Sequence, residues 1–283
     1  MSSFICPVCG KDLTTNEKSL SCPDGHAFDK ARCGYTNLLL SQQLKARRHG
    51  DDKLMVCSRQ AFLDKGYYNP LLAAILATVG KYAQNGHRII DAGCGECWYT
   101  ANIYADLAKN QIKPEMMAID ISKDALCAGA RRNREIELAV ASIFNLPVKD
   151  NSCDLLLNFF APCCGEEFRR VLKTGGCMIR VIPLEKHLWR LKTAVYEHPY
   201  ENEVGNCFLD GFELLEKLEI RRMIHLAGNE DILHVFTMTP YYYKTCIEDQ
   251  QKLRCLSELD TEIEFGILIY RKMSSERAWA SRP

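Results

Sequence analysis

Residues 88–96 read Arg-Ile-Ile-Asp-Ala-Gly-Cys-Gly-Glu. The apolar run predicts a buried strand, the two glycines predict a tight turn, and residues 98–109 have the pattern of a helix. Strand, glycine turn and helix in this order are typical of the first unit of a nucleotide-binding α/β fold. A second apolar run, residues 116–120, ends in Asp120, whose carboxylate could accept hydrogen bonds from both hydroxyls of a ribose. The sequence therefore predicts a Rossmann-like domain that binds a nucleoside.

The glycine turn differs from that of dinucleotide-binding enzymes. It reads Asp-Ala-Gly-Cys-Gly-Glu instead of Gly-x-Gly-x-x-Gly, and it resembles motif I of the class I S-adenosylmethionine-dependent methyltransferases. We favour this interpretation over an NAD-binding fold. Cys97 stands where that motif usually has a third glycine, so its side chain either crowds the cofactor or points away from it.

Later segments continue the α/β pattern. Five further strands are expected at residues 136–141, 154–158, 177–182, 219–226 and 263–270. Helices are expected at residues 166–172 and 241–256, with a turn at residues 173–176. The last two strands are expected to pair with each other. Together these elements predict the seven-stranded sheet of a Rossmann-like class I methyltransferase.

A metal-binding pattern lies near the N-terminus. Its four side chains are Cys6, Cys9, Cys22 and His26. Prolines and glycines that favour tight turns occupy positions 7, 10, 23 and 25, so two zinc knuckles explain the pattern better than a chance pairing of free thiols. Cys33 is an alternative fourth ligand that suits the second turn less well. Four protein ligands leave no open coordination position, which predicts a structural zinc ion in a small N-terminal domain.

Composition limits the class of protein. With 47% hydrophobic and 25% charged residues, the chain has the composition of a globular protein. The absence of a long apolar run and of a secretory leader, together with 15 cysteines, predicts a cytoplasmic protein with reduced thiols and no membrane partner. The formal net charge of zero argues against a strongly cationic nucleic-acid binder.

One basic cluster stands out from this neutral background. It contains Lys45, Arg47, Arg48, Lys53 and Arg59. Such a run is either a solvated loop or a local patch that binds phosphate groups, and the sequence leaves both readings open.

Several motifs follow the zinc pattern in a fixed order. They are residues 61–70 (Ala-Phe-Leu-Asp-Lys-Gly-Tyr-Tyr-Asn-Pro), the glycine turn, residues 161–163 (Ala-Pro-Cys), residues 187–188 (His-Leu) and residues 238–240 (Met-Thr-Pro). This set resembles the RlmA family of bacterial 23S rRNA (guanine-N1)-methyltransferases, over roughly residues 4–270. The resemblance implies that a guanine in a stem-loop of domain II, near the peptide exit tunnel, is the target. One branch of the family modifies a neighbouring guanine and is associated with resistance to tylosin-type macrolides.

The resemblance also implies that Tyr68, Gly95, Glu96 and His187 belong to the cofactor site. The glycine turn and the two strand ends add Asp91, Gly93 and Asp120 to this expected site. The expected organisation is a zinc-binding RNA-recognition module at residues 1–38, a basic linker and cofactor lid at 39–69, and the methyltransferase domain at 70–283. Whether the chain forms a homodimer is left open.

The catalytic group is not identified by the sequence. Guanine N1 carries a proton at neutral pH, and this proton must leave during methylation. No Asp or Glu occurs between Asp154 and Glu166, so the candidates after the fourth strand are Asn158, Phe160, Ala161 and Pro162, with Phe159 or Phe160 as a stacking wall. Phe160 stands where the family usually has tyrosine.

Two other functions are compatible with this sequence. A methyltransferase of the same fold could act on a small molecule, because one fold supports many substrates. A catalytically inactive RNA-binding homologue is the third hypothesis, and Cys97 in the glycine turn is its motive.

Overall fold

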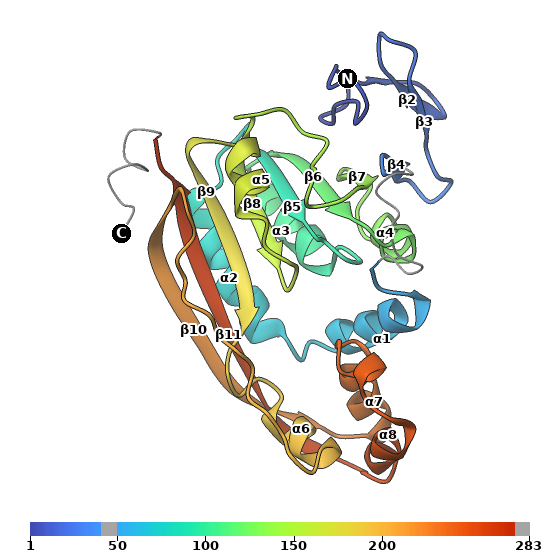
Figure 1. The fold of residues 1–283 in the computed structure, drawn as a ribbon, viewed down its shortest axis with the longest axis vertical. Helices are drawn as coiled ribbons and strands as arrows, with labels where there is room; N and C mark the ends of the chain where they lie inside the picture. The colour runs from blue at the N-terminus through green and yellow to red at the C-terminus, as the bar shows by residue number, and fades with distance from the viewer. Residues whose placement is uncertain (41–49, 275–283) are drawn as a thin grey trace.

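The central element is a mixed β-sheet. The computed structural model describes residues 1–40 and 50–274, and within them an eight-stranded sheet has the order β10-β11-β9-β8-β5-β6-β7-β4 (Figure 1). Its strands are β4 (Thr36–Asn37), β5 (Arg88–Ala92), β6 (Glu115–Asp120), β7 (Glu137–Val140), β8 (Cys153–Phe159), β9 (Leu172–Pro183), β10 (Phe212–Leu226) and β11 (Leu259–Lys272). Strand β11 runs antiparallel to both β9 and β10, and the remaining neighbours are parallel. The predicted class I methyltransferase sheet is thus confirmed, with one strand added by the N-terminal segment.

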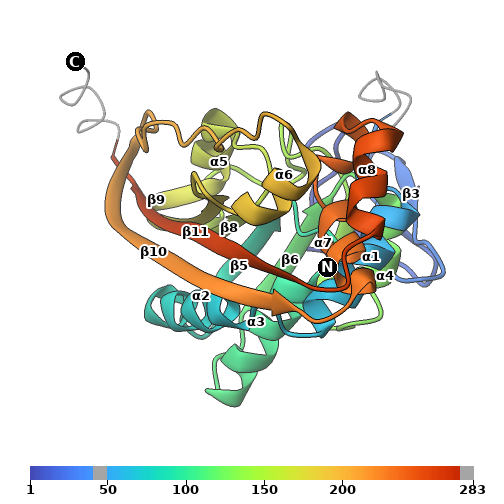
Figure 2. The same cartoon turned by 90° about the horizontal axis from the view of Figure 1, so that it is seen from below.

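Helices cover both faces of this sheet. Figure 2 shows α2 (Asn69–Tyr82) and α3 (Trp98–Lys109) on one face and α5 (Gly165–Val171) on the other. Neighbouring residues of β5 serve opposite faces, since Ile89 belongs to the core cluster of α2 and α3 and Ile90 to the cluster on the other face. A strand buried on both faces reads as a continuous apolar run, which is why the sequence identified β5.

Three further helices form a group beside the sheet. Helix α1 (Lys53–Asp64) packs against α7 (Asn229–Thr237), and α7 packs against α8 (Ile247–Arg254), at one end of the long β10–β11 pair (Figure 1). Helix α6 (Trp189–Val195) packs on β11, and α4 (Lys123–Gly129) lies between β6 and β7. The segment expected to be a linker and lid, residues 39–69, therefore contains helix α1, whose cap is the Asp52 side chain accepting from the Met55 N–H at 3.1 Å.

Two predicted elements differ from the structure. The turn expected at residues 173–176 is a bulge inside β9, where the register with β8 moves from Cys153↔Leu172 to Leu155↔Cys177 and Gly175 has φ +80°. The helix expected at residues 241–256 is broken into a 3-10 turn, η2 (Tyr242–Lys244), and the helix α8. The break comes at Thr245, which has an extended backbone and whose hydroxyl donates to the Tyr241 carbonyl at 2.8 Å.

The N-terminal segment is packed onto the sheet. Its own sheet has the order β1 (Thr14–Thr15), β2 (Ser19–Ser21) and β3 (Ala27–Asp29), whereas β4 pairs with β7 of the central sheet. Phe4, Leu13 and Leu20 are fully buried in the same core cluster as Ile90. A segment of about 40 residues buries little surface alone, so this shared core contributes to its stability. Independent folding of residues 1–38 stays a prediction.

Within the described residues, no helix is both long and apolar enough to cross a membrane.

Candidate metal centre and cofactor cavity

The four predicted metal ligands converge in the N-terminal segment. The ligand atoms of Cys6, Cys9, Cys22 and His26 all lie within 4.8 Å of one another. Cys9 Sγ is 3.6 Å from Cys22 Sγ, and His26 Nδ1 is 3.6 Å from Cys6 Sγ and 3.3 Å from Cys22 Sγ. A tetrahedral zinc ion with bonds of about 2.3 Å to sulfur and 2.0–2.1 Å to nitrogen requires ligand separations of about 3.5–3.8 Å. The four side chains fit a closed structural zinc site.

The zinc site generates the first prediction. We expect one zinc ion per purified chain, and we expect Cys9→Ser to lose it and to lower the melting temperature, because metal binding and local folding are coupled. Cys33→Ser is the matched control, since Cys33 lies in the same segment outside the ligand cluster. Elemental analysis and thermal unfolding measure both effects. Full zinc content in Cys9→Ser, or its loss in Cys33→Ser, would contradict the assignment.

A cavity of about 650 Å³ runs along the carboxyl edge of the central sheet. All the residues predicted for the cofactor contribute to its lining: Tyr68, Asp91, Gly93, Gly95, Glu96, Asp120 and His187. They come from β5, β6, the turn after β5, and the segments before α2 and α6. This volume is that of a site for a small-molecule cofactor.

The glycine turn is held in place from two sides. The Gly95 N–H and the Ser122 N–H each donate to a different Asp120 carboxylate oxygen, both at 2.8 Å. On the other side, a Cβ added to Gly93, whose φ is +94°, would lie 2.4 Å from the Ala161 Cβ. Only glycine allows both this backbone conformation and this close approach to the loop after β8.

Two buried carboxylates on the cavity wall each have an oxygen without a partner. Asp91 Oδ2 accepts from the Thr100 hydroxyl at 2.6 Å, and Glu96 Oε2 accepts from Arg132 Nε at 2.5 Å. Asp91 Oδ1 and Glu96 Oε1 have no hydrogen-bond partner within the described structure. Burial raises the pKa of both carboxyl groups to about 7. A ligand that carries an ammonium or other donor group would satisfy these oxygens, so this part of the cavity fits the amino-acid end of S-adenosylmethionine.

A pH dependence follows from the Asp91 environment. In the folded protein without ligand, the pKa of Asp91 is about 7, above its ordinary value of 3.8. Between about pH 4 and pH 7, the Asp91 carboxyl group is therefore protonated in the folded protein and ionised in the unfolded chain. The contribution of Asp91 to stability therefore falls as pH rises from about 4 to 7, by at most about 1.4 kcal/mol per pH unit. Asp91→Asn should remove this slope from the free energy of unfolding measured with denaturant.

The control for this measurement is Asp124→Asn, an exposed carboxylate at the start of α4. It should keep the parent pH dependence. A parent and an Asp91→Asn protein with parallel stability curves would show that Asp91 is ionised throughout.

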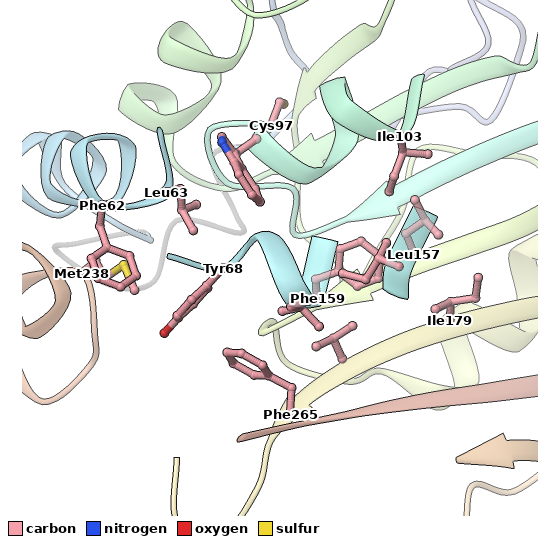
Figure 3. Close-up of a cluster of buried hydrophobic side chains, with 14 of the residues drawn as sticks. Phe62, Leu63, Tyr68, Cys97, Ile103, Leu157, Phe159, Ile179, Met238 and Phe265 are labelled. Atoms are coloured by element: carbon pink, nitrogen blue, oxygen red, sulfur yellow. The ribbon is translucent and has the colours of Figure 1, made fainter. Parts of the chain in front are cut away.

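Cys97 points away from the cavity. It has a left-handed backbone with φ 60° and is 1% exposed at the start of α3 (Figure 3). A Cβ added to Gly129 of α4 would lie 2.7 Å from its Sγ, so the thiol fills the space against that glycine. The left-handed conformation explains the usual glycine at this position, and the packing explains how cysteine is accommodated without crowding a cofactor.

This packing can be tested by a double-mutant cycle. Gly129→Ala should destabilise the fold by ~1–3 kcal/mol through overpacking, and it should cost less in a Cys97→Gly background because the opposing thiol is gone. Denaturant unfolding measures the coupling. Gly80→Ala is the control, since an added Cβ there meets open space. If the two substitutions have additive effects on the free energy of unfolding, Cys97 and Gly129 are not energetically coupled.

Tyr68 and His187 form a polar pair in an aromatic wall. Tyr68 is 4% exposed, and its ring packs edge-on against Phe265 with centroids 4.9 Å apart (Figure 3). The Tyr68 hydroxyl is 3.3 Å from His187 Nε2, and the Glu264 N–H donates to His187 Nδ1 at 3.2 Å. Burial, with the nearby Lys192 charge, lowers the pKa of His187 to about 3, so the ring is neutral with its proton on Nε2. Nε2 then donates to Tyr68, whose own proton is free for a ligand.

The candidate catalytic residues divide into two groups. Phe160, Ala161 and Pro162 line the cavity, whereas Asn158 supports the loop from behind. Asn158 is fully buried, and its Nδ2 donates to the Ala92 carbonyl at 3.0 Å and to the Pro162 carbonyl at 3.1 Å. Asn158 therefore joins the end of β5 to the loop after β8, and its Oδ1 has no hydrogen-bond partner among the described residues.

The predicted basic patch is only partly described. Lys45, Arg47 and Arg48 lie outside the described residues, and Lys53 is exposed at the start of α1. Arg59 differs from the expectation of an outward phosphate contact: it lines the cavity, pairs with Asp51 and donates to the Met238 carbonyl at 3.1 Å. It joins α1 to the segment after α7.

Several lining residues of the cavity were not predicted from the sequence. They include Asp51, Tyr99, Arg180 and Thr239, whereas Arg59 was predicted only for the basic patch. The Met-Thr-Pro motif at residues 238–240 was the available signal for Thr239, but the sequence assigned it no role. Arg180 had no signal, because it lies within the strand β9 without a motif of its own.

Comparisons with known proteins find family models for two parts of this chain. Residues 4–47 match the family model described as RlmA, N-terminal, and residues 83–228 match a methyltransferase domain model. A 23S rRNA (guanine(748)-N(1))-methyltransferase of Streptomyces fradiae is 34% identical over 229 residues, which are 78% of this chain and 79% of the relative. YxjB of Bacillus subtilis (strain 168) is 28% identical over 284 residues, and the match covers 96% of this chain and 98% of the YxjB chain.

Comparison with solved structures gives matches of low similarity. The YcgJ protein from Bacillus subtilis is 13% identical with a TM-score of 0.47, and the match covers 72% of this chain and 98% of that one.

Proposed function

This chain belongs to the RlmA family of 23S rRNA (guanine-N1)-methyltransferases, and from that premise we propose that it methylates N1 of a guanine in 23S rRNA, using S-adenosylmethionine. The finer target that we propose is a stem-loop of domain II near the peptide exit tunnel. One observation carries the proposal: a single cavity joins the acidic nucleoside site at Asp120 to an exposed aromatic ring at Phe160.

The cofactor half of the cavity is the part formed by the turn after β5 and the end of β6. There Asp120 would accept the ribose hydroxyls, Gly93 and Gly95 would allow close approach of the cofactor, and the orphan oxygens of Asp91 and Glu96 would accept from its ammonium group. Tyr68 would donate its free hydroxyl proton to the cofactor. When bound, S-adenosylmethionine supplies a methyl group already activated by the sulfonium charge. The protein then has mainly to align that methyl group with the base.

Asp120 provides the prediction for this half. Removing a charged acceptor should cost ~1.5–3 kcal/mol, so Asp120→Ala should weaken S-adenosylmethionine binding by roughly ten- to a hundredfold. Isothermal titration calorimetry measures the affinity. Asp124→Ala removes the same charge from the exposed start of α4 and should bind like the parent. Unchanged affinity in Asp120→Ala would place the ribose elsewhere.

The substrate half of the cavity is the part formed by the loops after β8 and β9 with residues 238–241. His187, predicted for the cofactor, lies in the loop after β9, and we propose that it contributes to both halves through its contact with Tyr68. Phe160 has a left-handed backbone with φ 55° and is 43% exposed, although phenylalanine disfavours both. Its ring contacts Phe265 with centroids 5.4 Å apart and Tyr99 with centroids 6.1 Å apart. An aromatic face held at the mouth of a cavity is suited to stacking on an unpaired guanine, and a base in an RNA loop is easily unstacked.

RNA recognition outside the cavity is assigned to the zinc module and the basic cluster. Their proximity in the chain favours a local phosphate-binding surface, which a protein of zero net charge needs in order to hold RNA. Lys45, Arg47, Arg48 and Lys53 are proposed for these contacts. Arg59, paired with Asp51 inside the cavity, is proposed instead to position α1 over the cofactor.

A transfer assay tests the proposed function. The purified protein, labelled S-adenosylmethionine and 23S rRNA lacking the modification should yield N1-methylguanine at one position, located by a reverse-transcription stop. Gly93→Val is the inactive control, because a side chain there collides with Ala161. Transfer to metabolites but not to RNA would support a small-molecule methyltransferase, and cofactor binding without any transfer would support an inactive homologue.

A further inference from the structure

Methylation of guanine N1 raises the question of where the N1 proton goes. The described carboxylates that line the cavity are Asp51, Asp91, Glu96 and Asp120. Asp91, Glu96 and Asp120 belong to the cofactor half. Asp51, which precedes α1, forms an ion pair with Arg59. Among the described residues, the substrate half therefore has no carboxylate that could accept the proton.

His187 does not serve as the base either. Its Nδ1 lone pair is occupied by the Glu264 N–H, and its Nε2 carries the proton that is shared with Tyr68. Burial raises the pKa of the Tyr68, Tyr99 and Tyr241 hydroxyls above their usual range, so these groups are proton donors at neutral pH. The histidine and tyrosine side chains of this region can therefore donate hydrogen bonds to the target guanine, but they cannot accept its N1 proton.

Arg180 has the opposite character. It lies on β9 beside Asn158 of β8, and it lines both the main cavity and an adjoining cavity of about 280 Å³. Strand β8 lies between β9 and β5, the strand that precedes the glycine turn. Arg180 on β9 therefore lies on the substrate side of the cavity. Within residues 1–40 and 50–274, Arg180 forms no ion pair, and its Nε is buried without an acceptor.

The groups around Arg180 leave its charge uncompensated. Cys163 faces it from the loop after β8 and Tyr270 from β11, and burial raises the pKa of both, so they are neutral. The Tyr270 hydroxyl donates to the Cys207 carbonyl at 2.9 Å, and its oxygen accepts a hydrogen bond from the Arg180 guanidinium without neutralising the charge. Glu203 lines the adjoining cavity but is exposed and not paired with Arg180. A half-buried guanidinium without a counterion indicates that its anionic partner arrives with a ligand.

We propose that Arg180 contacts O6 of the target guanine and stabilises the N1-deprotonated base, so that the N1 proton passes to water and not to a protein base. This inference rests on the proposed function. Loss of the N1 proton spreads negative charge over N1 and O6, and guanidinium is the group that most often contacts guanine O6 in protein–nucleic acid complexes. A fixed cation at O6 stabilises the charge that develops there.

The reaction balances without a further reactant. The N1–H bond breaks and its proton goes to water. The N1 electron pair then forms the bond to the methyl carbon, while the carbon–sulfur bond breaks and its electron pair stays on sulfur as a neutral thioether. The cation at Arg180 is unchanged at the end.

The test is the pH dependence of the methylation rate at saturating RNA and cofactor. Arg180→Gln and Arg180→Met should each lower the rate at neutral pH by roughly a hundred- to a thousandfold. They should also move the rising limb of the pH profile upward by about one pH unit or more, so that the deficit shrinks at alkaline pH. Arg180→Lys should keep most of the profile. Arg222→Gln, an exposed change on β10, is the charge-matched control and should match the parent.

Three outcomes would overturn the inference. A deficit that is constant across pH would mean that Arg180 only positions the substrate. An unchanged rate constant with weaker RNA binding, and a slope of log affinity against log salt reduced by about 0.7–0.9, would make Arg180 a phosphate contact. An unchanged rate would exclude a role for it. Measurements of melting temperature and cofactor affinity identify a variant that is misfolded. If one of the variants Arg180→Gln and Arg180→Met is misfolded, the other still tests the inference. If the parent itself fails to methylate 23S rRNA, the proposed function falls and this inference with it, whereas a methylating parent isolates the role of Arg180.

Discussion

The close approach of Gly93 to Ala161 is the constraint on which the rest of the site depends. A Cβ at Gly93 would lie 2.4 Å from the Ala161 Cβ, so the turn after β5 and the loop after β8 are in direct contact. Asn158 reinforces this contact by hydrogen bonding to carbonyls on both sides of it. The proposed cofactor turn and the proposed substrate loop are thereby held against each other. Methyl transfer requires the nucleophile and the methyl group to be aligned within a narrow range, which this contact favours.

Charge is distributed unequally across this site. Buried carboxylates gather at the turn after β5 and the end of β6, whereas the β9 side presents Arg180, which has no ion pair among the described residues. The acidic side suits a ligand with an ammonium and a sulfonium group, and the basic side suits a base that becomes negative as its proton leaves. This asymmetry accounts for two features that are costly on their own: carboxyl groups with a pKa raised to about 7 by burial, and an arginine Nε buried without an acceptor.

Much of the framework could be predicted from local sequence patterns. The strand β5 and the helix α3 have the predicted bounds, because a doubly buried strand and a glycine turn leave clear local signals. The four zinc ligands likewise follow from their spacing together with the prolines and glycines between them. The helices α1, α6 and α7 were not predicted, since their stability depends on packing against one another and on β11. The two-residue strand β4 has no periodicity of its own and exists because β7 offers it a partner.

Long-range packing also determines the positions of those site side chains that the sequence could not predict. The direction of the Cys97 side chain depends on the space beside Gly129, some thirty residues away in the chain. Arg59 lies inside the cavity because Asp51 and the Met238 carbonyl hold it there. No local motif encodes either result. The same holds for Arg180, which becomes notable only when the structure shows that no described acid faces it.

We propose that one cavity holds the cofactor on its acidic side and leaves the aromatic and basic side for a guanine. The most direct test is an experimental structure of the full chain with S-adenosylhomocysteine. We predict density for the ligand with its ribose hydroxyls on Asp120 and its ammonium group beside the Asp91 oxygen that has no partner here, while the space between Phe160 and Arg180 stays open to solvent. Ligand density that fills the space between Phe160 and Arg180, or that lies away from Asp120, would contradict this arrangement of the two ligands.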